Sequence, residues 1–160
     1  MSHPTTQQQF EQVMANCREL FCKKLHDYGT AWRIMRPESL TDQIFIKADR
    51  IRSIQMKGKA MVNEGIVPEF VAIVNYAIIA LIQLEHGAAQ EADFNEEQAQ
   101  AAYDKYAKEC LELMLRKNHD YDEAWRGMRV SSYVDLILMK ILRTKQIEDL
   151  EGQTLVSEGV

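Results

Sequence analysis

The side chains best suited to chemistry lie in a motif that occurs twice in the chain. Residues 24–36 read KLHDYGTAWRIMR, and residues 117–129 read KNHDYDEAWRGMR. Each copy places a histidine beside an aspartate, as His26-Asp27 and His119-Asp120. An imidazole next to a carboxylate can serve as a general base, and it can equally organise a loop through a hydrogen bond. We take His26 and Asp27 as candidate catalytic residues, with the loop-organising role as the alternative.

Basic side chains that recur in both copies predict an anion site. Lys47 and Arg50 stand three residues apart beside an apolar stripe, so we expect them at the edge of the core. Arginine binds phosphate oxygens in a bidentate manner, and lysine supplies a point charge. The candidates for binding a phosphorylated small molecule are Arg33, Arg36, Lys47, Arg50, Lys140 and Arg143, together with His119 and Asp120. The alternative is that these cations form structural ion pairs with Asp27, Asp42 and Asp49.

Carboxylates near the same cations predict a magnesium site. Asp42 and Asp49 are seven residues apart, which puts them on one helix face, and Glu64 and Glu69 border the next helix. Mg²⁺ favours a few carboxylates together with water and substrate phosphates, so Asp42, Asp49 and Glu64 are candidate ligands. Asp42 also fits a helix cap. Tyr28 and Trp32 could stack on a nucleobase, although aromatic side chains at a helix–loop corner also pin the loop to the core.

The two motifs belong to an internal repeat with an offset of 93 residues. From residue 24 to residue 55, 15 of 32 positions are identical to those 93 residues later. After a one-residue insertion, residues 58–66 match residues 152–160. The chain is therefore two copies of one unit, which we expect to occupy residues 1–87 and 94–160 of one compact body.

The hydrophobic spacing predicts only helices. Apolar residues recur every three or four positions over residues 6–26, and Asn95-x-x-Gln98 can cap the first helix of the second copy. Ser39-x-x-Asp42 and Ser132-x-x-Asp135 have the form of capping boxes for helices that run to about residues 57 and 149. Pro68 suits the first turn of a further helix that stops at Gly87. We expect an all-α bundle of about five helices.

The helix expected at residues 68–85 has no counterpart in the second copy. Residues 70–82 are apolar except at Asn75, a stretch too short to span a membrane, so we expect it to lie in a helical bundle. Two explanations are open: the natural protein is longer than this chain, or the second copy uses an apolar helix from elsewhere. Because several apolar residues of the second copy would otherwise be exposed, the sequence predicts a homodimer.

The composition of the chain argues against several classes of protein and indicates a cellular compartment. The chain has 160 residues, a net charge of −5 and three cysteines, an odd number without any CxxC pair. These features argue against a disulfide framework, a zinc ribbon and direct nucleic-acid binding. With no secretory signal in the sequence, we expect a cytoplasmic protein that does not contact membranes.

The repeated unit resembles a known family. The pattern is Lys-x-His-Asp-Tyr-x-x-Ala-Trp-Arg, followed by Asp42, Lys47, Arg50, then Glu64-Gly65 and Asn75-Tyr76. It resembles the nucleotide modification associated domain family of the first type, formerly a domain of unknown function. The resemblance implies an all-helical domain associated with nucleotide or DNA-base modification, and it adds Asn75 to the candidate substrate-binding residues. More distantly, the chain is similar to the MazG-type all-α nucleoside triphosphate pyrophosphohydrolases, which bind magnesium through carboxylates on bundle helices.

Two functions follow from these patterns. The first is Mg²⁺-dependent binding of a phosphorylated nucleotide, with pyrophosphohydrolysis as the reaction that it could serve. The alternative is a non-catalytic helical module in which the repeated polar residues form an ion-pair network. The sequence leaves open whether the protein is an enzyme.

Overall fold

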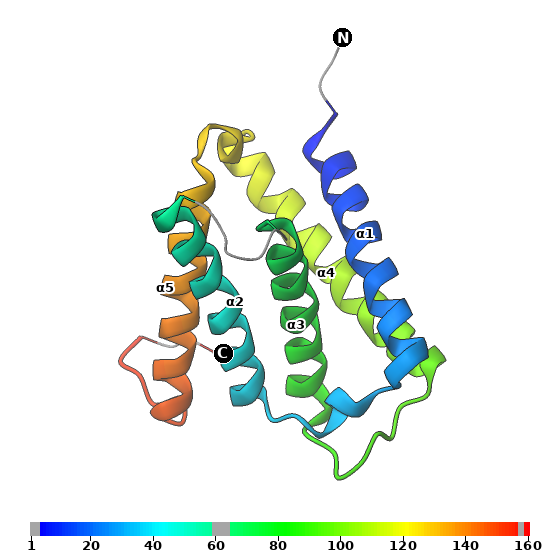
Figure 1. Cartoon of the computed structure of the whole chain (residues 1–160). Helices are drawn as coiled ribbons and strands as arrows, with labels where there is room; N and C mark the ends of the chain where they lie inside the picture. The colour runs from blue at the N-terminus through cyan, green and yellow to red at the C-terminus, as the bar shows by residue number, and fades with distance from the viewer. Residues whose placement is uncertain (1–3, 59–64, 157–158) are drawn as a thin grey trace. The chain divides into compact units, whose positions relative to one another are not determined.

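The structure is a computed structural model that describes residues 4–58, 65–156 and 159–160. Within these residues it is all-α, without strands (Figure 1). The five α-helices are α1 (Thr6–Tyr28), α2 (Pro37–Lys57), α3 (Val67–His86), α4 (Glu96–Tyr121) and α5 (Val130–Asp149). Two short 3₁₀ helices, η1 (Ala31–Ile34) and η2 (Ala124–Gly127), precede α2 and α5. The predicted fold class is confirmed.

The first helix of each copy begins with a capping box. Thr5 accepts a hydrogen bond from the backbone of Gln8, whose side chain in turn accepts one from the backbone of Thr5. Asn95 and Gln98 form the same reciprocal pair at the start of α4, as the sequence predicted. These bonds satisfy backbone donors that the first helical turn leaves without partners.

The capping boxes predicted at Ser39 and Ser132 are wrong. The two helices begin two residues earlier, at Pro37 and Val130, and neither has a side-chain cap. Arg36 is extended (φ −73°, ψ 150°), as a residue before proline prefers, and proline fits the first helical position. Asp42 therefore lies beyond the first turn of α2, where it cannot cap the helix.

The secondary structure repeats with the sequence. A shift of 93 residues carries the end of α1 onto the end of α4, η1 onto η2, and the start of α2 onto the start of α5. Only α3 has no counterpart among the described residues. The internal repeat is therefore one of structure as well as of sequence.

The chain forms two compact units that do not follow the repeat boundary. Unit 1 comprises residues 1–35 and 81–128, and unit 2 comprises residues 36–80 and 129–160. Unit 1 thus contains α1 and α4, whereas unit 2 contains α2, α5 and the larger part of α3. Each unit takes one equivalent helix from each copy of the repeat.

In unit 1, α1 and α4 run antiparallel. At one end of the pair, the Thr6 hydroxyl donates a 2.5 Å hydrogen bond to Glu123. At the other end, the hydroxyl of Thr30, the repeat equivalent of Glu123, donates a 2.8 Å bond to the Phe94 carbonyl. Between them, the rings of Phe21 and Tyr103 pack with centroids 4.5 Å apart. Each motif loop is therefore bonded next to the start of the other copy's first helix.

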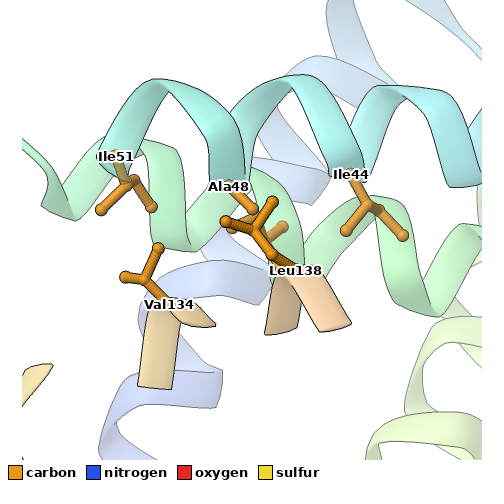
Figure 2. Close-up of a cluster of buried hydrophobic side chains, with 6 residues drawn as sticks. Ile44, Ala48, Ile51, Val134 and Leu138 are labelled. Atoms are coloured by element: carbon orange, nitrogen blue, oxygen red, sulfur yellow. The ribbon is translucent and has the colours of Figure 1, made fainter. Parts of the chain in front are cut away.

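In unit 2, α2 and α5 also run antiparallel, and their side chains form the core with α3. Figure 2 shows Ile44, Ala48 and Ile51 of α2 directed toward Val134 and Leu138 of α5. Ile73 of α3 belongs to the same buried cluster. Because Ala48 is fully buried and has only one methyl group, the helices can approach closely at that position.

α3 is apolar over most of its length. It is long and apolar enough to cross a membrane by these two criteria alone, which core helices of soluble proteins also meet. In the structure, every residue from 70 to 82 is buried or half-buried. The helix predicted at residues 68–85 is present with nearly the expected bounds.

Candidate functional site

Lys47 and Arg50 of α2 converge on a single carboxylate. Glu69, in the first turn of α3, lies 3.6 Å from the Lys47 ammonium and forms a hydrogen-bonded ion pair with the Arg50 guanidinium. Glu69 is almost completely buried, whereas the Lys47 and Arg50 side chains retain 31% and 35% of their exposure. We call these three residues the α2–α3 cluster. In this cluster, two cations at the protein surface form ion pairs with one buried acid.

The cluster follows from the local sequence of the two helices. Residues three apart on a helix lie side by side, which aligns Lys47 and Arg50. Pro68 lies in the first turn of α3 next to Glu69, and an acid in that turn is also stabilised by the helix dipole. The Glu69 Oε2 atom is buried without a hydrogen-bond partner, and the nearby Lys47 ammonium offsets its charge. The pair of cations is therefore oriented by a buried acid rather than by solvent.

The equivalent cations of the second copy lie in a different environment. Lys140 and Arg143 correspond to Lys47 and Arg50 in the repeat, and both are exposed on α5. The described residues place no counterpart of α3 beside them. The two copies thus share these cations but differ in what surrounds them.

The predicted magnesium ligands do not gather in the part of the chain that the structure describes. Asp42 lies 3.7 Å from Lys145 across the α2–α5 pair, and Asp49 is exposed. Glu64 lies outside the described residues. No group of three His, Cys, Asp or Glu side chains that could hold a metal ion occurs among the residues described. Glu69, the acid nearest the predicted anion site, faces two cations, an environment that disfavours a further cation.

The histidine–aspartate pairs lie on the surface of unit 1. His26 Nδ1 is 3.3 Å from Asp27 Oδ1, and the corresponding atoms of His119 and Asp120 are 3.5 Å apart. All four side chains are exposed, His26 at 80% and His119 at 88%. Tyr28 is also exposed. The predicted catalytic pair is therefore well hydrated and belongs to a different unit from Lys47 and Arg50.

Arg33 has a structural environment in unit 1. Its buried guanidinium donates to Asp93 at 2.8 Å, to the Gly87 carbonyl at 2.9 Å and to the side chain of Gln83. The hydrogen bond from Arg33 lowers the pKa of the Asp93 carboxyl below its usual value. Gln83 is fully buried, and its amide donates to the carbonyls of Arg33 and Met35 at 2.8 and 2.7 Å. This network joins the first motif to the end of α3 and to the linker before α4.

Arg126 repeats part of this arrangement in the second copy. It donates to the Pro4 carbonyl at 3.0 Å, next to the N-cap of α1, and to Glu123 at 3.1 Å. The hydrogen bonds from Arg126 and then Thr6 lower the pKa of Glu123 to about 2. The motif arginine of each copy therefore contacts the segment that leads into the first helix of the other copy.

The remaining candidates are dispersed. Trp32 is half-buried and packs near Phe21 and Phe94, with ring centroids 6.3 and 6.2 Å away, so its ring contacts lie within unit 1. Arg36 is exposed at the N-cap of α2. Asn75 is buried in α3.

Three residues important to these networks were not among the predicted ligands, although Glu69 was noted as an acid bordering the helix. Glu69, Gln83 and Asp93 are the partners of Lys47, Arg50 and Arg33. A polar residue in an otherwise apolar helix was the available signal for Gln83, and the first-turn acid after Pro68 was the signal for Glu69. Neither signal names its partner, which depends on packing between distant segments.

The comparison with family models identifies the relationship of this chain. The model of nucleotide modification associated domain 1 matches residues 24–84 and 117–160, which include both motifs. The chain belongs to the nucleotide modification associated domain 1 family. The matched segments contain the whole α2–α3 cluster and both copies of its cations. No curated protein and no solved structure matches the chain significantly.

Proposed function

We propose that this member of the nucleotide modification associated domain 1 family binds a phosphorylated nucleotide through Lys47 and Arg50. The observation that carries the proposal is the convergence of an ammonium and a guanidinium on the buried Glu69 while both heads stay partly exposed. Preorganised cations at the protein edge suit phosphate oxygens, which arginine binds in a bidentate manner. The family description, which concerns nucleotide modification, agrees with a nucleotide as the ligand.

Glu69 does not prevent phosphate binding. In contact with Glu69, the Lys47 and Arg50 side chains still keep 31% and 35% of their surface exposed. Glu69 approaches from α3, and the exposed sides of the two cations remain accessible to solvent. In this proposal the carboxylate holds the cations in place and the phosphate binds at their outer side.

In this proposal Mg²⁺ is bound by the nucleotide and not by the protein alone. The described residues at the α2–α3 cluster contribute one carboxylate that already faces two cations, so they do not suit a resident divalent ion. Nucleoside triphosphates bind Mg²⁺ through their own phosphate oxygens. The proposal concerns binding and includes no hydrolytic step.

The test is a titration of nucleoside mono-, di- and triphosphates, with and without Mg²⁺, by calorimetry and thermal shift. Lys47→Met/Arg50→Met removes both charges and keeps apolar side-chain volume, and it should lower nucleotide affinity at least tenfold. The matched control is Lys140→Met/Arg143→Met, which changes the repeat equivalents and should leave the affinity within about twofold. Equal affinity in all three proteins would contradict the proposal.

A non-catalytic module held together by ion pairs is the second candidate. It is favoured by Arg33, which is buried among protein acceptors, and by the paired charges between α2 and α5. Glu69→Gln distinguishes the two. If Lys47 and Arg50 bind phosphate, removing the competing charge should preserve or raise nucleotide affinity despite a lower melting temperature. If they are structural only, the melting temperature falls and no nucleotide stabilises either protein.

A further inference from the structure

One face of α5 carries apolar side chains that the core of unit 2 does not use. Leu136, Met139 and Leu142 are 42%, 55% and 49% exposed. Their three-residue spacing places them on one side of the helix. Val134 and Leu138, which lie in the buried cluster, occupy the opposite side. α5 is therefore apolar on two faces, and the described residues cover only one of them.

The repeat shows that this second apolar face is particular to α5. At the equivalent positions, α2 has Gln43, Ile46 and Asp49, of which Ile46 and Asp49 are exposed. Two polar residues in the first copy are thus leucines in the second, at the same register of the same kind of helix. Since the fold of α2 needs no leucine there, packing within the unit does not account for the leucines of α5.

The charges beside this face are arranged symmetrically about its centre. Asp135 lies four residues before Met139, and Arg143 lies four residues after it. Both are exposed. Asp135 lies 3.9 Å from Arg52, and an exposed ion pair of this kind contributes little to stability.

We propose that a second copy of this chain covers the face, with the two α5 helices antiparallel about a two-fold axis near Met139. This arrangement places the Asp135 end of each helix alongside the Arg143 end of the other, so opposite charges meet twice. It also brings the Leu136–Leu142 stripes together, as an isologous interface requires. A membrane surface fits less well, because the exposed Asp135 adjoins Leu136 at one end of the stripe, and an anionic lipid surface repels a carboxylate.

Sedimentation velocity and light scattering across micromolar to millimolar protein concentrations test the proposal. A helix face of this size predicts a weak, concentration-dependent dimer. Leu136→Gln/Leu142→Asp, which installs the residues of the first copy, should abolish the dimer and preserve the circular dichroism spectrum. The control Ile46→Ser, on the equivalent face of α2, should leave it intact. A wild-type monomer throughout the range, or a dimer unaffected by the double substitution, would overturn the proposal.

Charge reversal tests the antiparallel register independently of stability. Asp135→Arg alone and Arg143→Asp alone each oppose like charges across the interface, so each protein should dimerise less than the wild type. Mixing the two should restore association as a heterodimer, because both contacts then join opposite charges. A mixture that associates no better than its components would overturn the proposed register and the interface with it.

Discussion

At the scale of single residues, Gln83 and Arg33 form a buried polar network. The Gln83 side chain accepts from the Arg33 guanidinium and donates to two backbone carbonyls, while Asp93 holds the rest of the guanidinium. Because burial excludes water from these groups, removing one of them would leave the others without a hydrogen-bond partner. The network explains why an arginine of the repeated motif is buried in unit 1.

Gln83→Leu should destabilise the protein by about 2–4 kcal/mol, because it leaves a buried guanidinium N–H and two carbonyls without partners. Urea unfolding followed by circular dichroism measures the loss. Gln90→Leu, at an exposed position of the linker, is the matched control and should change stability little. Equal stability of the two variants would contradict a structural role for the network.

We expect the carboxyl of Glu148 to make the stability of the protein depend on pH. Burial raises the pKa of its carboxyl above the usual value, an effect larger than the lowering by a hydrogen bond from Thr41. Because the folded state disfavours the charged form, this group lowers stability as the pH rises from the unfolded pKa through the folded one. Glu148→Gln should therefore raise the melting temperature at pH 7, with a smaller gain below pH 4. A gain that is the same at both pH values would contradict this cause.

At the scale of elements, equivalent helices of the two copies pair with each other within unit 2. Asp42 faces Lys145, and Arg52 faces Asp135, and these two contacts exchange under the 93-residue repeat. The α2–α5 pair therefore has local pseudo-two-fold symmetry, visible in Figure 1 as two antiparallel neighbours. Its centre is the buried row of Ile44, Ala48 and Ile51.

Ala48→Leu should destabilise unit 2 by about 1–3 kcal/mol, since three added carbons must fit between Val134 and Leu138 without free volume. The second copy has Ile141 at the equivalent position, which is only half-buried. Ala101→Leu, on an exposed face of α4, provides the control for helix propensity and should have little effect. Chemical denaturation of both variants measures the difference, and equal midpoints would show that the contact is not tightly packed.

At the scale of the whole molecule, the compact units cross the repeat boundary. α1 needs α4, and α2 needs α5, so each unit is completed only when both copies are present. Within unit 1, Arg33 and Arg126 strengthen the contact between the two copies. Arg33 binds the segment that leads into α4, and Arg126 binds the segment that leads into α1. The repeat copies that the sequence predicts as units of the chain are thus interleaved in three dimensions.

Cleavage between Gln90 and Glu91, both exposed, tests this interleaving. Separately produced fragments 1–90 and 91–160 should each be less helical than their share of the intact chain, because each lacks the partner helices. Mixing them in equal amounts should restore helicity and cooperative melting. Fragments that fold fully alone and gain nothing on mixing would instead support the repeat copies as the folding units.

Local patterns were enough to predict the helical elements from the sequence. The spacing of apolar residues and the capping residues of α4 predicted the fold class and most helix bounds, because these features depend on neighbours within a few residues. The starts of α2 and α5 were misplaced by two residues, since Ser39 and Asp42 imitate a capping box within a helix that had already begun at Pro37.

The tertiary structure alone decided which charges meet. Lys47 and Arg50 were recognisable as cations at a core edge, but the sequence offered Asp27, Asp42 and Asp49 as equally plausible partners, and packing of α3 supplied Glu69 instead. Likewise, no local rule pairs Arg33 with Asp93, 60 residues away, or assigns α4 as the partner of α1. Such pairings depend on which apolar faces bury each other across the chain, and that choice brings particular acids and bases within a few ångströms.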